Sequence, residues 1–268
     1  MSSPESHSRD TSFAVCLDAA GTLLTVARPV GQTYSAIAAR HGVALAPDAL
    51  SQGFRSVFPA MPPLGFGRAY DPTSAEDTTE LHALERDWWR RLVLAVVESC
   101  SLQDGMTRGF DDFDRFFVEL YEYYESPQSW TLYPETIEVL DRLRARGLRT
   151  AVVSNFDTRL ERILPSLGVT ERVDAVICST RAGAAKPDAP IFERALAALG
   201  ATPARAVHVG DNAAADLDGA RNAGLHALLI DRSSGAGSCT HGIATLHGVL
   251  DWLDEHDSPG SSRRRTAE

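Results

Sequence analysis

Short apolar runs separated by amphipathic segments occupy the chain from about residue 132 onward. In one such segment Ile137, Leu140 and Leu143 recur at three- and four-residue steps, which is the spacing of one helix face, and Gly147 follows as a C-cap signal. The apolar runs in this region have the length of buried strands and lie at 149–154, 174–179, 205–210 and 226–231, and a fifth run of this kind lies near the start of the chain at 13–17. Because helical segments connect these runs, the pattern predicts an α/β fold whose core is a doubly wound, Rossmann-like parallel sheet.

Residues 27–130 follow a different pattern, which is strongly helical and rich in aromatic side chains. Phe113, Phe116 and Leu120 recur at three- and four-residue steps, as in a helix core, and 58–74 is a loop rich in proline and glycine. We therefore predict a helical cap inserted into the α/β core, with hinges at the linkers 26–31 and 126–132. The expected boundaries are a flexible tail at 1–12, a core formed by 13–26 and 131–255, a cap at 27–130 and a second flexible tail at 256–268.

The charge balance excludes some classes of partner. The 268-residue chain has a formal net charge of −10, whereas nucleic acids and anionic membranes are bound by a basic face. No apolar run reaches the roughly 18 residues of a membrane span, and the opening MSSPESHSRDTS lacks the apolar centre of a signal peptide. The 4 cysteines are far apart, which predicts reduced thiols. We expect no nucleic-acid partner, no membrane partner and an intracellular, cytoplasmic location, with an organelle not excluded. The sequence does not indicate the oligomeric state.

Four of the predicted strands end near residues that can carry chemistry. In an open parallel sheet such groups gather at one edge, beyond the carboxyl ends of the strands. They are Asp18 after the first strand, Ser154 and Asn155 after the second, Lys186 a few positions beyond the third, and Asp211 and Asp216 after the fourth. Lys186 is also the only lysine in a chain with 26 lysine and arginine residues. We expect these side chains to meet at one edge of the sheet.

The chemistry of such a cluster is coherent. Three carboxylates that converge repel one another unless a divalent cation binds, and an all-oxygen site with open positions suits Mg²⁺. Lys186 would balance the remaining negative charge and hold a small anionic substrate. The Ser154 hydroxyl and the Asn155 amide would donate hydrogen bonds to the same anion. Asp18, at the tip of the first strand, would be a carboxylate nucleophile.

The segments LDAAGTLL, VVSNFD, AKP and HVGDNAAADLDGA resemble, in this order, the four signatures of the haloacid dehalogenase-like (HAD) hydrolase superfamily. The resemblance spans Asp18 to Asp216 and implies a helical cap and a Mg²⁺-dependent hydrolysis through a phosphoaspartyl intermediate on Asp18. It implies three sets of residues: Asp18, Thr22, Ser154 and Lys186 for catalysis, Ser154, Asn155 and Lys186 for substrate binding, and Asp18, the Ala20 carbonyl, Asp211 and Asp216 for the metal.

Ala20 departs from the family pattern. Phosphatases of the family place an aspartate there, which protonates the leaving alcohol and then activates water, an effect worth roughly 10²–10⁴-fold in rate. The family uses the backbone carbonyl at this position as the metal ligand, and Ala20 still has one. The sequence therefore predicts a phosphatase of weak or unusual activity on a small phosphorylated metabolite. The alternative is a non-catalytic HAD-fold protein that binds a ligand or partner.

Two active branches of the family also lack an acid at this position. The phosphonoacetaldehyde-hydrolysing branch resembles DAAGT but needs a cap lysine, and Lys186 is the only lysine here. The 2-haloacid dehalogenase branch has an aromatic residue there and no acid at the position of Asp211, so it fits less well.

His208 is expected to be a core histidine bonded to backbone groups. Candidates for substrate contact from the cap are Arg68, Arg90 and Arg91.

Overall fold

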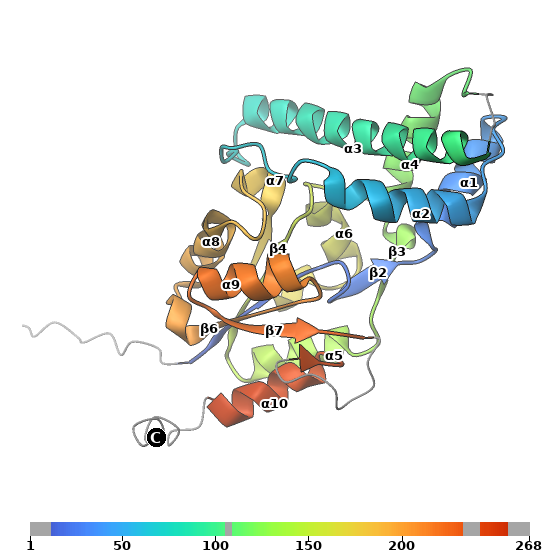
Figure 1. Cartoon of the computed structure of the whole chain (residues 1–268). Coiled ribbons are helices and arrows are strands. Elements are labelled where there is room, and N and C mark those ends of the chain that lie inside the picture. The colour runs from blue at the N-terminus through green and yellow to red at the C-terminus, as the bar shows by residue number, and fades with distance from the viewer. Residues whose placement is uncertain (1–11, 105–108, 233–241, 257–268) are drawn as a thin grey trace, which may run out of the picture.

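A six-stranded parallel sheet forms the centre of the structure, a computed structural model that describes residues 12–104, 109–232 and 242–256 (Figure 1). Its strands are β1 (Ala14–Leu17), β4 (Arg149–Ser154), β5 (Ala175–Cys178), β6 (Ala206–Gly210), β7 (His226–Ile230) and β8 (Gly242–Ile243). They lie in the order β5-β4-β1-β6-β7-β8, and every neighbouring pair is parallel. The predicted α/β core is thereby confirmed. The predicted tails, apart from their innermost residues, lie outside the described residues.

The structure contains strands at all five predicted positions and adds two features to them. β8 is 2 residues long and extends the sheet by pairing with Leu229 and Ile230 of β7, so it is too short to show a periodic pattern. β2 (Leu24–Val26) and β3 (Trp130–Leu132) pair in antiparallel fashion. Val26 and Ala27 of the first predicted linker therefore lie beside Trp130 and Ser129 of the second, at the end of a β-ribbon that carries the chain out of the sheet region and back into it.

Helices cover both faces of the sheet because side chains alternate along each strand. On β1, Val15 and Leu17 pack with helices of one face, whereas Ala14 and Cys16 pack with helices of the other. The first face carries α5 (Thr136–Ala145), α6 (Leu160–Ser166) and α10 (His247–His256), and the second carries α7 (Ser179–Ala182), α8 (Ala189–Leu199) and α9 (Gly219–Asn222). Short helical turns complete the fold: η1 (Phe58–Ala60), η2 (Pro127–Ser129), η3 (Thr170–Arg172), η4 (Pro203–Arg205) and η5 (Ala213–Asp218).

Four helices between β2 and β3 form a unit that we call the helical module. They are α1 (Val30–Arg40), α2 (Pro47–Val57), α3 (Ala75–Asp104) and α4 (Phe113–Glu125). They enclose a hydrophobic core of their own, in which Phe116 and Leu120 of α4 pack with Trp88 and Leu92 of α3. In Figure 1 the module lies beyond the carboxyl ends of β1 and β4, so it covers the edge of the sheet where chemistry is expected.

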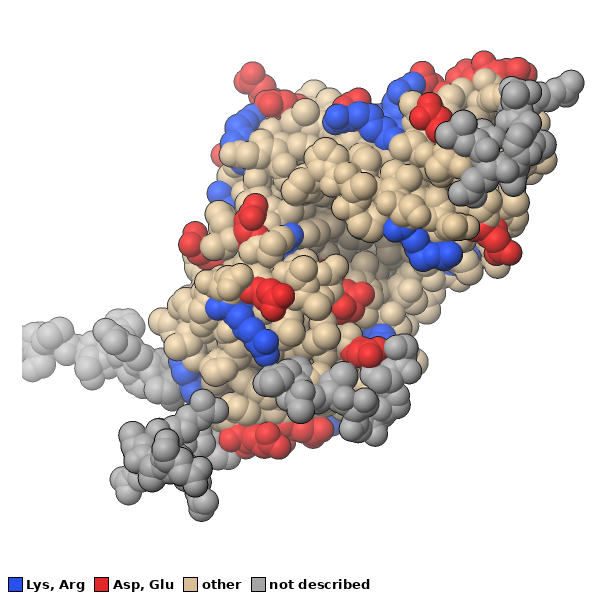
Figure 2. All heavy atoms as spheres, in the orientation of Figure 1, with Lys and Arg blue, Asp and Glu red and all other residues tan. Residues whose placement is uncertain are grey.

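The surface carries mixed charge. On the face drawn in Figure 2, basic side chains stand apart among acidic and uncharged ones and do not gather in one patch. Within the described part of the chain, no helix combines the length and the apolar character that crossing a bilayer requires. Cys16, Cys100 and Cys178 are buried, Cys16 and Cys178 are free thiols, and Cys239 lies outside the described residues.

Candidate active site

Asp18 follows β1 directly, where the chain turns back on itself. Its N–H donates to the Val209 carbonyl of β6 at 2.8 Å, which extends the ladder by one residue. The Ala19 carbonyl then accepts the N–H groups of Leu23 and Leu24 at 2.8 and 3.0 Å, and Gly21 takes a φ of 87° that favours glycine. This tight turn fixes the Asp18 carboxylate at the edge of the sheet, where the residue is 7% exposed.

Lys186 lies against Asp18 with its ammonium group fully bonded. Its Nζ donates to Asp18 Oδ1 at 2.7 Å, to Asp216 Oδ1 at 2.5 Å and to the Val153 carbonyl at 2.9 Å, which uses all three protons. Asn155 holds the lysine backbone, because its Nδ2 donates to the Lys186 carbonyl at 2.8 Å and its Oδ1 accepts the Lys186 N–H at 2.7 Å. Burial acts to lower the pKa of Lys186, but Asp18 and Asp216 raise it overall, so the ammonium stays charged at neutral pH.

Asp216 is the most strongly held carboxylate of the cluster. Besides Lys186, it receives the Asn212 N–H at 3.0 Å on Oδ2 and has His208 Nε2 at 2.9 Å from Oδ1. Burial opposes ionisation, but Lys186 and His208 hold the pKa of Asp216 below its usual range. The expectation of backbone partners for His208 is wrong: Nε2 meets Asp216, and Nδ1 has no hydrogen-bond partner among the described residues.

Asp211 completes a cluster of three carboxylates at this edge. One oxygen each from Asp18, Asp211 and Asp216 lies within 4.8 Å of the others. Among the described residues, Lys186 is the only lysine or arginine that bonds to these carboxylates, and the charge of Arg232 also acts on Asp211, so a surplus of negative charge remains when all three are ionised. Burial raises the pKa of Asp18 by more than the charge of Lys186 lowers it. Partial burial and the charge of Asp216 raise the pKa of Asp211. Oxygen ligands with this surplus fit a divalent cation such as Mg²⁺.

The other predicted site residues surround this cluster. Thr22 is fully buried, its carbonyl accepts from Arg232 Nη2 at 2.5 Å, and its hydroxyl has no hydrogen-bond partner among the described residues. Ser154 ends β4 and is buried. Asn155 uses its side chain to position Lys186 and also lines a cavity, as does Ala20. The structure thus brings every predicted site residue to one edge of the sheet, and the roles assigned to them remain predictions.

The cavity lies between the core and the helical module. Its volume is about 280 Å³, and Ala20, Gly21 and Asn155 line it on the side of the carboxylate cluster. The remaining lining is mainly aromatic and includes Tyr34, Phe54, Trp89, Tyr124, Trp130 and Phe156. Arg159 is the only charged side chain among the described residues that line it.

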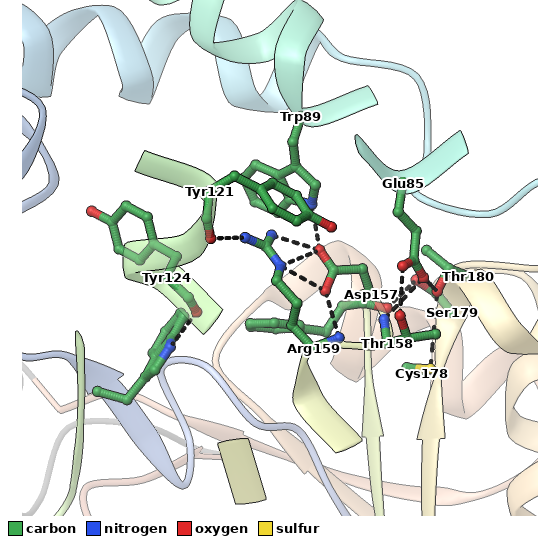
Figure 3. Close-up of polar contacts among 12 residues, drawn as sticks. Glu85, Trp89, Tyr121, Tyr124, Asp157, Thr158, Arg159, Cys178, Ser179 and Thr180 are labelled. Atoms are coloured by element: carbon green, nitrogen blue, oxygen red, sulfur yellow. Dashed lines mark hydrogen bonds and ion pairs between the residues drawn. The ribbon is translucent and has the colours of Figure 1, made fainter. Parts of the chain in front are cut away.

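Arg159 is fully engaged by neighbouring groups (Figure 3). Its Nε lies 3.0 Å from Asp157 Oδ1, its Nη2 donates to Asp157 Oδ2 at 2.6 Å, and its Nη1 donates to the Tyr121 carbonyl at 3.2 Å. The guanidinium also lies over the Tyr121 ring, 4.0 Å from its centre. Trp89 Nε1 donates to Asp157 Oδ2 at 2.5 Å, so a buried ion pair of the core is bonded to two helices of the module.

A second contact in Figure 3 joins α3 to the core. Glu85 accepts from the Thr158 N–H at 2.9 Å, from the Thr158 hydroxyl at 2.6 Å and from the Thr180 hydroxyl at 2.5 Å. Burial and then the charge of Asp157 raise the pKa of Glu85 to about 7, although the threonine donors act against this. The carboxyl group is therefore close to half ionised near neutral pH.

The sequence did not indicate these module–core contacts, and it suggested three other arginines. Arg68 pairs with Asp77 and Glu80, Arg90 with Asp114, and Arg91 with Asp87, all at the surface, and none of these arginines is among the residues that line the cavity. The expectation that these arginines contact substrate is therefore not supported, because their charges are used in local ion pairs. The one signal for the buried pair was the close spacing of Asp157 and Arg159 directly behind the Ser154–Asn155 segment.

A Rossmann-like sheet with a helical insertion directly behind its first strand-tip carboxylate places the chain among hydrolases of the haloacid dehalogenase type. Residues 14–224 match the family model of the haloacid dehalogenase-like hydrolase, and the chain belongs to this family. It is 36% identical over 215 residues to the haloacid dehalogenase-like hydrolase domain-containing protein 3 of Homo sapiens, a match covering 80% of this chain and 79% of the human protein. A phosphoserine phosphatase of Thermus thermophilus is 37% identical over 111 residues, which cover 41% of this chain and 45% of that enzyme.

Solved structures agree on the fold. The HAD phosphatase from Thermococcus onnurineus has a TM-score of 0.60 at 24% identity, covering 90% of this chain and 97% of its own. The L-2-haloacid dehalogenase from Xanthobacter autotrophicus has a TM-score of 0.63 at 19% identity, covering 91% of this chain and 98% of its own. Because a phosphatase and a dehalogenase match about equally well, the fold alone does not select the reaction.

Proposed function

We propose that this hydrolase is a Mg²⁺-dependent phosphatase that cleaves phosphate monoesters through a phosphoaspartyl intermediate on Asp18. The observation that carries the proposal is the contact of Asp18 with Lys186 beside two further carboxylates, with oxygens of all three within 4.8 Å. A nucleophilic carboxylate needs a nearby cation to bring a phosphate dianion to it, and this edge offers both a lysine and a place for a metal ion.

In the proposed reaction an Asp18 oxygen attacks phosphorus, and the bond from phosphorus to the ester oxygen breaks. The leaving oxygen keeps the bonding electron pair, so it departs as an alkoxide or phenoxide unless a proton reaches it. Water then attacks phosphorus of the phosphoaspartyl group, and the bond to the Asp18 oxygen breaks with its electron pair, which frees the carboxylate. One proton of the water stays on the released phosphate, and the other passes to solvent, where the departed alkoxide or phenoxide also takes up its proton. Lys186 stays charged in both steps and balances the phosphoryl oxygens, together with donors from Ser154 and Asn155.

The residues present fit a divalent cation. Asp18, Asp211, Asp216 and the Ala20 carbonyl would hold it, and when bound it supplies positive charge at the phosphoryl oxygens. The excess of negative charge among the three carboxylates matches that cation. The unpartnered Thr22 hydroxyl is a further polar group at the same turn that remains free to bond to a ligand.

Ala20 decides which substrates can react. A methyl group neither protonates a leaving oxygen nor activates water, so the family's usual gain of roughly 10²–10⁴-fold is absent from this position. Substrates with weakly basic leaving groups lose least from this absence. The helical module would act as a cap, because it covers the site and closes the cavity between module and core.

A non-catalytic binding protein is the second candidate, and Ala20 favours it. The same contacts of Lys186 with Asp18 and Asp216 would then be a retained ion-pair network that anchors a phosphate or a cation. Dehalogenation is a weaker candidate, because Asp211 completes a carboxylate cluster that attracts a metal ion and so disfavours a free carboxylate attacking a halocarbon.

Hydrolysis of phenyl phosphate, whose leaving group needs little protonation, distinguishes these candidates. We expect turnover by the natural protein with Mg²⁺, loss of turnover with EDTA, and a loss of at least about 10³-fold in Asp18→Asn, because the covalent route is closed. Ala20→Asp is expected to gain most on alkyl phosphates, roughly 10²-fold, because an acid at this position protonates the leaving group.

The outcome that would contradict the proposal is equal residual activity of the natural protein and Asp18→Asn in metal-replete buffer. Asp218→Asn serves as the matched control for Asp18→Asn. Asp218 is an exposed aspartate at the end of η5 that lies outside the three-carboxylate cluster, so this variant should keep full activity.

A further inference from the structure

The cavity beside the carboxylate cluster indicates what kind of group a substrate carries behind its phosphate. Ala20 and Gly21 lie within three residues of Asp18, and Asn155 follows Ser154, so the residues nearest the reacting phosphate also line the cavity. A phosphate held at Asp18 therefore has its ester group next to this space. Across from these residues the lining is formed by aromatic side chains of the helical module and the ribbon, among them Tyr34, Phe54 and Trp130.

This lining offers no uncompensated charge to a substrate. Arg159 is 3% exposed, and Asp157 and the Tyr121 carbonyl already accept its hydrogen bonds. Asp157 in turn is held by Trp89. Because the Asp157–Arg159 pair is neutral as a unit, a second anionic group on the substrate would enter the cavity without a partner, and an unpaired buried charge is strongly unfavourable.

The size of the cavity suits an aromatic body. A dry cavity of roughly 150 Å³ is enough to bind benzene, and about 280 Å³ is available here. The added space corresponds to a second fused ring or a comparable apolar group. Flat apolar groups also gain from edge-to-face and stacked contacts with the aromatic rings of the lining.

Ala20 points to the same class of substrate by a separate argument. Without an acid at this position the ester oxygen must leave unprotonated, which a phenoxide does far more readily than an alkoxide. A phenyl or naphthyl ester therefore satisfies both requirements, since it fills an aromatic cavity and departs without help.

From these observations we infer that the substrate class of this site is an aryl phosphate monoester whose body is uncharged and apolar. This inference rests on the proposed phosphatase function and narrows it. The inferred substrate carries no charged group besides its phosphate. It therefore differs from the small phosphorylated metabolite that the sequence predicted.

Three aryl phosphates with leaving groups of similar acidity test the inference: phenyl, 2-naphthyl and 3-carboxyphenyl phosphate. We expect kcat/KM for 2-naphthyl phosphate to exceed that for phenyl phosphate by roughly tenfold, because the second ring fills the cavity. The carboxylate of 3-carboxyphenyl phosphate should lower kcat/KM by roughly tenfold or more, because it has no partner there. Equal or faster turnover of the carboxylated ester would overturn the inference while leaving the phosphatase proposal intact.

A ring added to the cavity wall gives a second test. Val26 of β2 lines the cavity, and Val26→Phe should remove the preference, because it lowers kcat/KM for the naphthyl ester by roughly tenfold or more and that for phenyl phosphate by less. Thr131→Phe is the matched control, because it adds the same ring at an exposed position on the partner strand of the ribbon and should keep the preference. If Val26→Phe fails to fold, as judged by its melting curve, Val30→Phe at the start of α1 fills the same space. A naphthyl preference that survives in a folded filling variant contradicts the inference.

Binding to Asp18→Asn separates the inference from the catalytic proposal. Trp89 and Trp130 line the cavity, so tryptophan fluorescence reports on a ligand inside it without turnover. We expect 2-naphthyl phosphate to quench this fluorescence with a Kd at least tenfold lower than that of 3-carboxyphenyl phosphate. If the natural protein hydrolyses none of the esters but this ranking holds, the phosphatase proposal fails and the inferred ligand class stands. If the ranking is absent, the inference fails whatever the activity.

Discussion

Gly21 is the residue at which backbone geometry and the carboxylate cluster meet. Its φ of 87° lies in the left-handed region, and a Cβ at this position would lie 2.2 Å from Asp211 Oδ2. Asp211 is exposed, so its side chain can rotate away from such a methyl group. That rotation would take one of the three carboxylates out of the cluster that we propose holds the metal ion.

Gly21→Ala is therefore expected to damage both stability and metal-dependent activity. The left-handed conformation costs an alanine roughly 1–2 kcal/mol in the free energy of unfolding, measured by urea denaturation. The displaced Asp211 should raise the Mg²⁺ concentration needed for half-maximal phenyl phosphate hydrolysis by roughly tenfold or more, as typical for a disturbed metal ligand shell.

Gly42 supplies the control for this substitution. It has a φ of 76°, and a Cβ there would meet nothing within 4 Å. Gly42→Ala should lose a similar amount of stability and keep the Mg²⁺ requirement unchanged. An unchanged Mg²⁺ requirement in Gly21→Ala as well would contradict the assignment of Asp211 to the metal.

At this scale the sequence predicts the strand-tip residues well and the cavity poorly. Asp18, Lys186 and Asp216 could be placed together because parallel strands bring their carboxyl ends to one edge. The bond from Trp89 to Asp157 could not, because it joins segments separated by 68 positions whose packing no local pattern specifies. His208 illustrates the same limit, since its burial was predicted but its partner was not.

At the scale of elements, α3 is the helix that ties the module to the core. Glu85 and Trp89 are four residues apart, hence on one face of the helix, and both bond to the loop before α6. Glu85 is fully buried and bonds only to uncharged donors, while the negative charge of Asp157 lies nearby. This arrangement makes the contact between helix and core depend on pH.

The raised pKa of Glu85 predicts that stability falls as pH rises. Glu85 has a pKa of about 7 in the folded protein, against an ordinary value of 4.5. Between these values the folded protein keeps a proton that the unfolded chain has released, so the free energy of unfolding decreases with rising pH. The full effect, reached above pH 7, is at most about 3 kcal/mol.

Urea unfolding of the natural protein and Glu85→Gln at pH 5 and pH 8 measures this contribution. The natural protein should lose more stability than Glu85→Gln over this interval, because glutamine does not titrate. Glu98→Gln, an exposed position on the same helix, should behave like the natural protein. Parallel pH dependence in the natural protein and Glu85→Gln would mean that Glu85 is ionised throughout.

Predictability of the elements depends on their length. The apolar runs gave the positions of five of the six described sheet strands to within one or two residues, and β1, β4 and β6 among them are buried on both faces. The sequence did not predict β8, which has 2 residues, or β2 and β3, which have 3 residues each. Strands this short are defined by their pairing with distant segments and show no periodic pattern. The sequence predicted that the module is helical, but it did not predict which face of α3 contacts the core.

At the scale of the whole molecule, the module touches the core along three lines besides the contacts that α4 makes through the Tyr121 carbonyl and Glu125. The ribbon is one, and it is continued by the Ala27 N–H, which donates to the Ser129 carbonyl at 2.8 Å. The face of α3 is the second. The third is a loop of the module, in which the N–H groups of Gly67 and Tyr70 donate to core carbonyls at 2.9 and 3.0 Å. A movement of the module away from the core, which would widen access to the cavity, requires some of these contacts to open.

We expect the second and third lines to open while the ribbon stays closed. Both strands of the ribbon continue directly into the core and form their own ladder, whereas the loop is joined to the core by a few separate backbone hydrogen bonds. Hydrogen exchange resolves these amides individually. In the free protein the amides of Gly67, Tyr70 and Thr158 should exchange at least tenfold faster than those of β1, and the Ala27 amide should be protected more than they are.

Adding 2-naphthyl phosphate and Mg²⁺ to Asp18→Asn should slow exchange at Gly67, Tyr70 and Thr158 and leave the Ala27 amide unchanged. Closure on a ligand stabilises the bonds that must break for opening, and the ribbon is formed in both states. The β1 amides serve as the internal control for global unfolding, because they exchange only when the sheet itself opens. If Ala27 exchanges as fast as Gly67, the ribbon breaks during opening and the hinge lies within it. If all four amides exchange as slowly as β1, the module does not open as a unit, and substrate must enter through local movement of side chains around the cavity.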